Sequence, residues 1–344
     1  MLSIRNLLKY GSVSAALYVV STAPVLALGE CGLSCCLAGA ATSGVTLAQN
    51  FGLSLQYEHS DMETILHGKD EVSPDEVINV HWTPGSSYSV PTSMVMEKLS
   101  LIGALPLSAR WQLLGIVPYV RNNMDMRMKN PMGMTMDMSM ETIEGLGDIT
   151  AMAYYTARTD APLRPTERLT FGFGLKMPTG ENDVRNANGN LVHAMMQTGS
   201  GSWDPIFTVN YMRAWYPLVM QFNGYYHLTT EGDEGYEFGD QLGVDVITRY
   251  QVAPYVNLGL DLNAIHTEQD DDHDGKFSRP ANSMVDNPAY TGLNSVLLAA
   301  SVQFKFPNTG GSAELKYQVP VYQDVEGYQQ VLDNRILASV SWAF

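Results

Sequence analysis

Apolar and polar residues alternate with a period of two along most of this chain. The pattern is clearest over Ile336–Phe344, where every even position is apolar and Ser339 and Ser341 stand between them. Successive side chains of a β-strand point to opposite faces. This alternation therefore predicts a strand with one apolar face and one hydrated face.

The same alternation recurs in twelve segments of the sequence. They are Leu47–Glu58, Met94–Leu105, Arg110–Arg121, Gly147–Ala157, Arg168–Pro178, Trp203–Met212, Pro217–Leu228, Gln241–Tyr250, Tyr255–His266, Asn294–Phe306, Ser312–Tyr322 and Ile336–Phe344. Inside hydrocarbon the backbone has no water to bond to, so such strands must pair until the sheet closes. We therefore predict an all-β fold, a 12-stranded antiparallel transmembrane β-barrel. A soluble β-sandwich is the alternative.

The connections between these segments alternate in length. Those after even-numbered segments are mostly short, such as 106–108 and 251–254, whereas most of those after odd-numbered segments are long, such as 59–93 and 267–293. Short periplasmic turns opposite long extracellular loops are typical of outer-membrane barrels. A β-sandwich gives no reason for this sorting.

The first residues have the pattern of an export signal. Arg5 and Lys9 precede an apolar run, and small residues follow, so we expect residues 1–29 to be a cleaved signal peptide. Residues 30–45 would form a periplasmic or lumenal segment, and residues 46–344 the barrel. We expect the protein in the outer membrane of a Gram-negative bacterium.

All the cysteines lie in the 30–45 segment, at Cys31, Cys35 and Cys36. A disulfide with one thiol left over, a soft-metal site and a thioether haem link all stay open, although the spacing C-x-x-C-H is absent.

The chain is acidic: its formal charge of −16 becomes −18 once Arg5 and Lys9 leave with the signal. No basic cluster could neutralise phosphates, which argues against nucleic-acid binding. We expect as partners outer-membrane lipid and lipopolysaccharide, the outer-membrane assembly machinery and a small-molecule substrate.

The positions opposite the apolar stripes would face the lumen. They include charged and polar side chains of both signs: Lys98, Arg110, Asp148, Lys176, Asp204, Asn210, Gln221, Asn223, His227, Asp245, Arg249, Asp261, Asn263, Glu314, Lys316 and Arg335. Charges in a narrow lumen need a counter-charge or water. These residues would form ion pairs around a hydrated substrate path, or simply stiffen the barrel.

Short glycine-rich motifs add a family resemblance. Gly145–Ile149, Gly174–Gly180 and Gly199–Pro205 resemble the outer-membrane barrels grouped as the meta-pathway phenol-degradation-like transporter family. The final strand, ending on Phe344, likewise resembles the closing strand of bacterial outer-membrane barrels. The family resemblance implies an outer-membrane channel for hydrophobic or aromatic compounds and no enzymatic activity.

Methionine recurs at nearly every second position after the third segment. The ladder contains Met124, Met126, Met128, Met132, Met134, Met136, Met138 and Met140. Thioethers are soft ligands that favour Cu(I), so the ladder predicts a copper(I) site on an extended hairpin. An adaptable apolar lid over the channel is the alternative.

An acidic loop carries Asp270, Asp272 and Asp274 ahead of Gly275, with the early ligand spacing of a calcium loop. The expected glutamate at its end is Ala281. A partial calcium site and a solvated acidic loop both fit.

Two functions follow from these patterns. The first is an outer-membrane channel for small hydrophobic or aromatic molecules with a Met-rich outer loop. The second is a copper-binding outer-membrane protein that captures Cu(I) on the ladder. A barrel phospholipase or protease is disfavoured because no Ser and Asn pair accompanies His266, and a sheath for a cytochrome because twelve strands enclose too narrow a tube.

Overall fold

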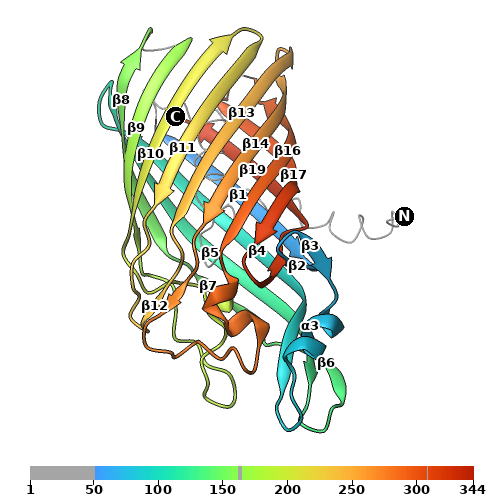
Figure 1. Ribbon diagram of the computed structural model, residues 1–344. Coiled ribbons are helices and arrows are strands. Elements are labelled where there is room, and N and C mark those ends of the chain that lie inside the picture. The colour runs from blue at the N-terminus through green and yellow to red at the C-terminus, as the bar shows by residue number, and fades with distance from the viewer. Residues whose placement is uncertain (1–50, 162–164, 308) are drawn as a thin grey trace, which may run out of the picture.

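The computed structural model describes residues 51–161, 165–307 and 309–344. Within them twelve strands form one closed antiparallel barrel (Figure 1). They are β1 (Gly52–Met62), β4 (Tyr88–Pro106), β5 (Trp111–Lys129), β8 (Ile149–Thr159), β9 (Glu167–Met177), β10 (Asp204–Trp215), β11 (Leu218–His227), β13 (Gln241–Ala253), β14 (Val256–Thr267), β16 (Leu293–Lys305), β17 (Gly311–Val325) and β19 (Asn334–Ala343).

The barrel closes where the first strand meets the last. Leu55 of β1 pairs with Val340 of β19, and the register continues along both strands. The predicted 12-stranded barrel is therefore confirmed. The signal peptide, Cys31, Cys35, Cys36 and the start of the first predicted strand lie outside the described residues.

Exposure alternates along the strands as the sequence pattern predicts. On β1, Leu55 and Tyr57 face outward, whereas Gln56 and Glu58 are buried in the interior. The same holds around the barrel, so its outer surface is an apolar belt with exposed aromatic side chains such as Trp111 and Tyr250 near the short turns. A belt flanked by aromatic residues matches the hydrocarbon layer and its interfaces.

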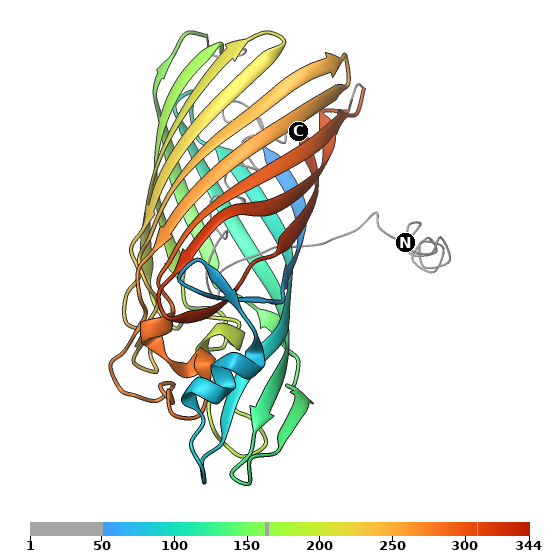
Figure 2. The ribbon, with the colours of Figure 1, turned by 45° about the vertical axis from the view of Figure 1, so that its right-hand side comes forward.

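The long loops carry small elements of their own at one end of the barrel (Figures 1 and 2). They are β2 (Thr64–His67), β3 (Asp70–Val72), α3 (Pro74–His81), β6 (Thr135–Ser139), β7 (Ile143–Leu146), η1 (Ala194–Met196), β12 (Tyr236–Glu237), β15 (Asp271–Asp272), η2 (Met284–Asp286), η3 (Pro288–Tyr290) and β18 (Tyr328–Val331). Among the described residues, no helix is long and apolar enough to cross a bilayer. We call this end the outer mouth.

Two strands exceed their predicted length by the most. β4 and β5 have 19 residues each and continue past the neighbouring strands into the outer mouth, as Figure 2 shows. β6 pairs with the end of β5, with Met138 opposite Met126 and Met136 opposite Met128. The methionine ladder is therefore the end of a barrel strand at the outer mouth together with its hairpin, not a free loop.

Candidate functional site: the barrel interior and its outer mouth

Ion pairs cross the inner wall from strand to strand. The Arg249 guanidinium lies 2.5 Å from a carboxylate oxygen of Asp261 and 2.5 Å from one of Glu314, and Lys316 Nζ lies 2.5 Å from Asp261. All four side chains are buried. Because neighbouring strands supply opposite charges, the wall is polar without carrying a large net charge.

A second group is centred on Arg335. Its guanidinium lies 3.0 Å from Glu58 and donates to Gln318 Oε1 over 3.0 Å, while Lys98 lies 3.1 Å from Glu58. The Gln318 amide donates in turn to Asn263 over 2.5 Å. This group joins β14, β17, β19, β1 and β4, so it runs across the seam where the barrel closes.

Amide side chains continue this belt toward β10. Asn263 donates to Asp245 over 2.7 Å, and Asn210 donates to Asn223 and, over 3.4 Å, to Gln221. Asn223 is half-buried, and the other four are buried. Polar contacts therefore follow most of the inner circumference.

The three glycine-rich motifs meet at one junction inside the wall. Lys176 of the second motif lies 3.6 Å from Asp148 of the first, and it pairs with Asp204 of the third. Lys176 Nζ also donates to Ser200 over 2.8 Å, and His227 lies 3.7 Å from Asp204. These five residues form what we call the motif junction.

The glycines of the motifs let their backbones touch. A Cβ on Gly199 would lie 2.5 Å from the backbone of Gly180, and one on Gly180 would lie 2.7 Å from that of Gly199. This contact allows the Gly180 N–H to donate to Asp148 over 3.0 Å, and the Ser200 N–H to donate to the same carboxylate over 2.8 Å. The motifs therefore fix a buried carboxylate with backbone donors.

One predicted lumen residue is misplaced. Arg110 is exposed in the short turn before β5, and its guanidinium donates to the outward-facing Tyr155 hydroxyl over 3.2 Å. The predicted strand began one residue before β5, where the alternation no longer reports the facing. The other predicted lumen residues lie on the inner face.

The methionine ladder divides into two halves. Met124 and Met126 are buried on the inner face of β5, and Met128 and Met140 are half-buried. The remaining four point to solvent: Met132, Met134, Met136 and Met138. Met126 pairs with Met138 and Met128 with Met136, so these four side chains share one face of the hairpin, as the alternation predicts. The two halves differ in exposure because the hairpin extends beyond the residues that cover Met124 and Met126.

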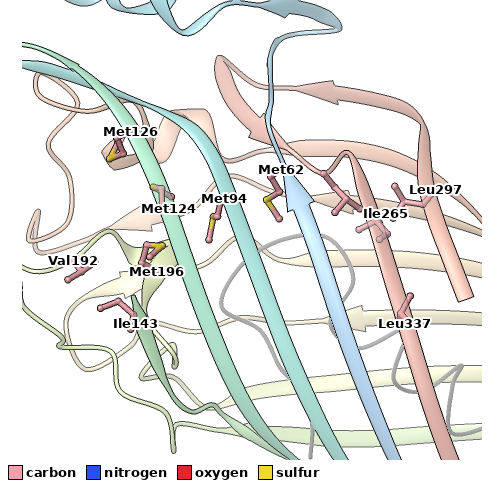
Figure 3. Packing of buried hydrophobic residues seen from close by; sticks show 11 residues of the cluster. Met62, Met94, Met124, Met126, Ile143, Val192, Met196, Ile265, Leu297 and Leu337 are labelled. Atoms are coloured by element: carbon pink, nitrogen blue, oxygen red, sulfur yellow. The ribbon is translucent and has the colours of Figure 1, made fainter. Parts of the chain in front are cut away.

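The inward half joins a methionine cluster at the outer mouth, shown in Figure 3. Met62, Met94 and Met124 are register partners on β1, β4 and β5, so they form one row across three strands. Met126 extends the row along β5, and Met196 packs against it from η1. These five thioethers, all buried, are the methionine cluster.

A pocket opens beside the methionine cluster. Its wall includes Met62, Met94, Met96, Met195 and Met284 together with the rings of Tyr290 and Tyr328. The pocket is partly open to solvent. We call it the mouth pocket. Its apolar lining with a few polar groups is typical of a site for a small apolar molecule.

Hydrogen bonds and an ion pair join two outer loops beside the mouth pocket. Asp286 of η2 bonds to His193 beside η1, and the Arg279 guanidinium lies 2.9 Å from the same carboxylate. Arg279 also donates to the backbone carbonyl of Leu191 over 3.1 Å. These contacts hold Met195 and Met284, which flank them in the sequence, at the mouth pocket.

One carboxylic acid lines the mouth pocket. Asp270 is buried, and it accepts hydrogen bonds from the Tyr236 hydroxyl (2.6 Å) and the Gly239 N–H (2.8 Å). Burial raises the pKa of Asp270 to about 6. Burial, together with this neighbouring carboxylate, raises the pKa of Tyr236 well above its usual value.

The acidic loop does not assemble the predicted calcium site. Asp272 accepts hydrogen bonds from the N–H groups of Phe277 (2.8 Å) and Ser278 (2.6 Å), and Asp274 lies 3.0 Å from Lys276. With Asp270 turned to the mouth pocket, the carboxylates serve separate partners. In the described part of the chain, no group of three or more His, Cys, Asp or Glu side chains is arranged to hold a metal ion.

Sequence reasoning missed several residues of these sites. Glu58 and Arg168 have the inward phase of their strands, so the period-two pattern contained the signal for both. Met94 and Met96 share the inward phase of Lys98, so the same pattern contained a signal for them. Met284 gave none, because only the folded chain brings its loop to this site.

Comparisons with known proteins agree with the barrel. Residues 103–328 match the model of a family described as putative MetA-pathway of phenol degradation. The COG4313 outer membrane channel from Pseudomonas putida F1 is similar at a TM-score of 0.55 and 15% identity, over 87% of this chain and 98% of that one. A Pseudomonas aeruginosa FadL homologue matches at a TM-score of 0.43 and 10% identity, over 86% and 91% of the two chains. At these identities the likeness shows the fold alone. A search of curated proteins gives no significant match.

Proposed function

We propose that this chain, which belongs to the family described as putative MetA-pathway of phenol degradation, is a channel for small hydrophobic or aromatic molecules in the outer membrane of a Gram-negative bacterium. The mouth pocket carries the proposal, because it offers an apolar binding site at the outer end of a barrel whose inner wall carries ion pairs. The barrel of similar fold from Pseudomonas putida F1 is itself an outer membrane channel, which supports the same reading.

The lining of the mouth pocket suits ligands of varied shape. Methionine side chains are flexible and polarisable, so they adapt to different apolar molecules and favour contact with aromatic rings. Tyr290 and Tyr328 add ring faces with polar tips. Farther into the barrel the inner wall carries ion pairs, so a molecule would leave the apolar site for a more polar path.

The proposed position in the membrane gives the outer surface its partners. The apolar belt would contact outer-membrane lipid, the outer loops would meet lipopolysaccharide, and the assembly machinery would insert the barrel. These partners follow from the fold and from the apolar outer surface of its strands.

Uptake by intact cells tests the channel. A hydrocarbon dissolves directly in a phospholipid bilayer, so an artificial bilayer does not test its passage through the channel. We would therefore measure, by fluorescence, the entry of N-phenyl-1-naphthylamine into cells that lack general porins. Cells that make the protein should take up the probe several-fold faster than cells that do not. Met195→Glu, which places a charge in the mouth pocket, should abolish the gain, whereas the exposed Met134→Glu should retain it.

Equal uptake with and without the folded protein would contradict the channel. Equal uptake by the two glutamate variants would instead remove the mouth pocket from the path.

We propose copper(I) capture as a second candidate function, because the methionine cluster gathers five buried thioethers in one packed group, three of them register partners. Soft sulfur ligands favour Cu(I) over harder cations. The inward cluster replaces the exposed ladder as the site of this proposal.

An anaerobic titration tests this candidate, with a chromophoric chelator competing for Cu(I). Replacing Met62, Met94 and Met124 by Leu should weaken binding at least tenfold. The same replacement of Met132, Met134 and Met136, which are exposed, should leave it unchanged. If both triple variants bind as the natural protein does, copper capture by methionine is excluded.

A further inference from the structure

Arg168 is a basic residue on the inner wall that lacks an acidic partner. It lies near the short-turn end of β9, where it is register partner to the buried Met212 of β10, and it is only 7% exposed. Its Nε atom is buried without a hydrogen-bond partner. Among the residues that the structure describes, no carboxylate lies within ion-pair distance of its guanidinium.

The other buried lysines and arginines of the barrel strands differ in this respect. Lys98, Lys176, Arg249, Lys316 and Arg335 each have a carboxylate within 3.6 Å. Burying a charge without a counter-ion costs free energy, so an unpaired buried arginine does not stabilise the fold. Arg168 is therefore poorly explained as part of the ion-paired wall.

The surroundings of Arg168 are neutral and partly unpartnered. Thr170, next along the inner face of β9, has an unbonded hydroxyl, and its register partner Asn210 on β10 has an unbonded side-chain carbonyl oxygen. These groups could bind a polar ligand head, because a buried polar atom normally finds a partner.

An apolar surface adjoins this polar site. Ile102, Leu114, Met152, Tyr154 and Ile206 pack together on the inner faces of β4, β5, β8 and β10. Tyr154 is register partner to Gly172 of β9, two residues from Thr170, so the apolar cluster borders the polar groups on that strand. A ligand with an apolar body and an anionic head would satisfy both surfaces.

We propose that Arg168 is an anion-binding subsite at the inner end of the channel, and that the molecules passing it are small organic monoanions with an apolar or aromatic body. This inference rests on the proposed channel function. The guanidinium presents two parallel N–H donors that match a carboxylate or sulfonate. The solute would bind first at the mouth pocket through its apolar body and then at Arg168 through its charge.

Planar-bilayer recordings test the subsite. The probes are benzenesulfonate, a permanent anion, and benzenesulfonamide, a neutral molecule of nearly the same shape. From reversal potentials in a gradient of sodium benzenesulfonate we expect the anion-to-sodium permeability ratio to fall about fivefold or more in Arg168→Gln. Arg168→Lys should keep most of it, and Arg110→Gln, which removes an exposed arginine at the same end, should keep all of it.

A second measurement needs no variant. Benzenesulfonate should reduce the chloride current of the natural protein, whereas the same concentration of benzenesulfonamide should not. This keeps the inference testable even if Arg168→Gln inserts poorly.

The outcomes separate the inference from the channel itself. An unchanged permeability ratio in Arg168→Gln, or equal effects of the two probes on the chloride current, would overturn the subsite. If cells that make Arg168→Gln still take up N-phenyl-1-naphthylamine, the channel function survives. Loss of both uptake and conductance in the natural protein would overturn the channel and the subsite together.

Discussion

The inner wall of the barrel takes its side chains from paired strands, whereas the outer mouth combines the ends of paired strands with loops far apart in the sequence. Arg249 and Asp261 meet because β13 and β14 are neighbours, and their charges cancel. Met195 and Met284 meet at the mouth pocket only because two long loops fold together. The ion pairs of the wall thus follow from strand pairing, whereas the mouth is an apolar assembly that can vary without altering the barrel.

The largest expected effect comes from breaking the wall at the motif junction. Lys176→Met would leave Asp148 and Asp204 buried side by side without their cation. Removing one partner of a buried ion pair typically costs about 3–5 kcal/mol. We expect a loss of that order in the free energy of unfolding, measured by urea in phospholipid vesicles with tryptophan fluorescence.

The matched control makes the same lysine-to-methionine substitution at an exposed position. Lys305→Met removes a lysine that is exposed at the end of β16 and should change stability little. Similar stability of the two variants would mean that the junction does not hold the wall.

The methionine ladder provides the second test, because one strand and its hairpin contribute to both environments. Met124→Ala would open a cavity in the buried methionine cluster, and such truncations cost about 2–5 kcal/mol. Met134→Ala removes a side chain that is 54% exposed and should cost less than about 0.5 kcal/mol. Comparable losses of stability, measured by the same urea unfolding, would show that Met134 on the outer hairpin is packed as tightly as Met124.

The ladder also shows how far the sequence could predict this molecule. Its period of two correctly indicated extended chain, because alternation is a local property of a strand. It could not show that β5 continues beyond β8, nor that Met124 and Met126 are buried while Met136 and Met138 are exposed, because both depend on how the strands and outer loops assemble. Arg110 failed for a related reason: alternation loses its meaning one residue outside a strand.

The residues of the candidate site also divide into those that strand pairing places and those that contacts between loops place. Lys176 and Asp204 were predicted as lumen residues from alternation, and their contact follows from the pairing of β9 with β10. The turning of Asp270 toward Tyr236 instead of toward Asp272 and Asp274 depends on the contact between two loops. The spacing of its neighbours carried no sign of that contact.

The third test sharpens the contrast through pH. The folded mouth holds a proton on Asp270 up to about pH 6, whereas the unfolded chain loses it near pH 4. The folded state therefore binds more protons between these values, and stability should fall as pH rises through that window. The loss should be on the order of 2–3 kcal/mol in local stability.

Hydrogen exchange of residues 268–292 at pH 4.5 and 7 would measure this effect. Asp270→Asn cannot ionise, so its exchange should depend much less on pH after correction for the intrinsic rate. An equally steep dependence in the variant would assign the effect to another group.

The smallest expected effect concerns the backbone contact of the glycine motifs. Gly199→Ala would press a methyl group against the Gly180 backbone, where the free space ends at 2.5 Å. Overpacking of this kind costs about 1–3 kcal/mol. Gly103→Ala is the control, because a Cβ there meets nothing within 4 Å. If the two alanine variants unfold at the same urea concentration, the contact between the second and third motifs is loose. The backbone hydrogen bonds to Asp148 would then have to hold the junction without it.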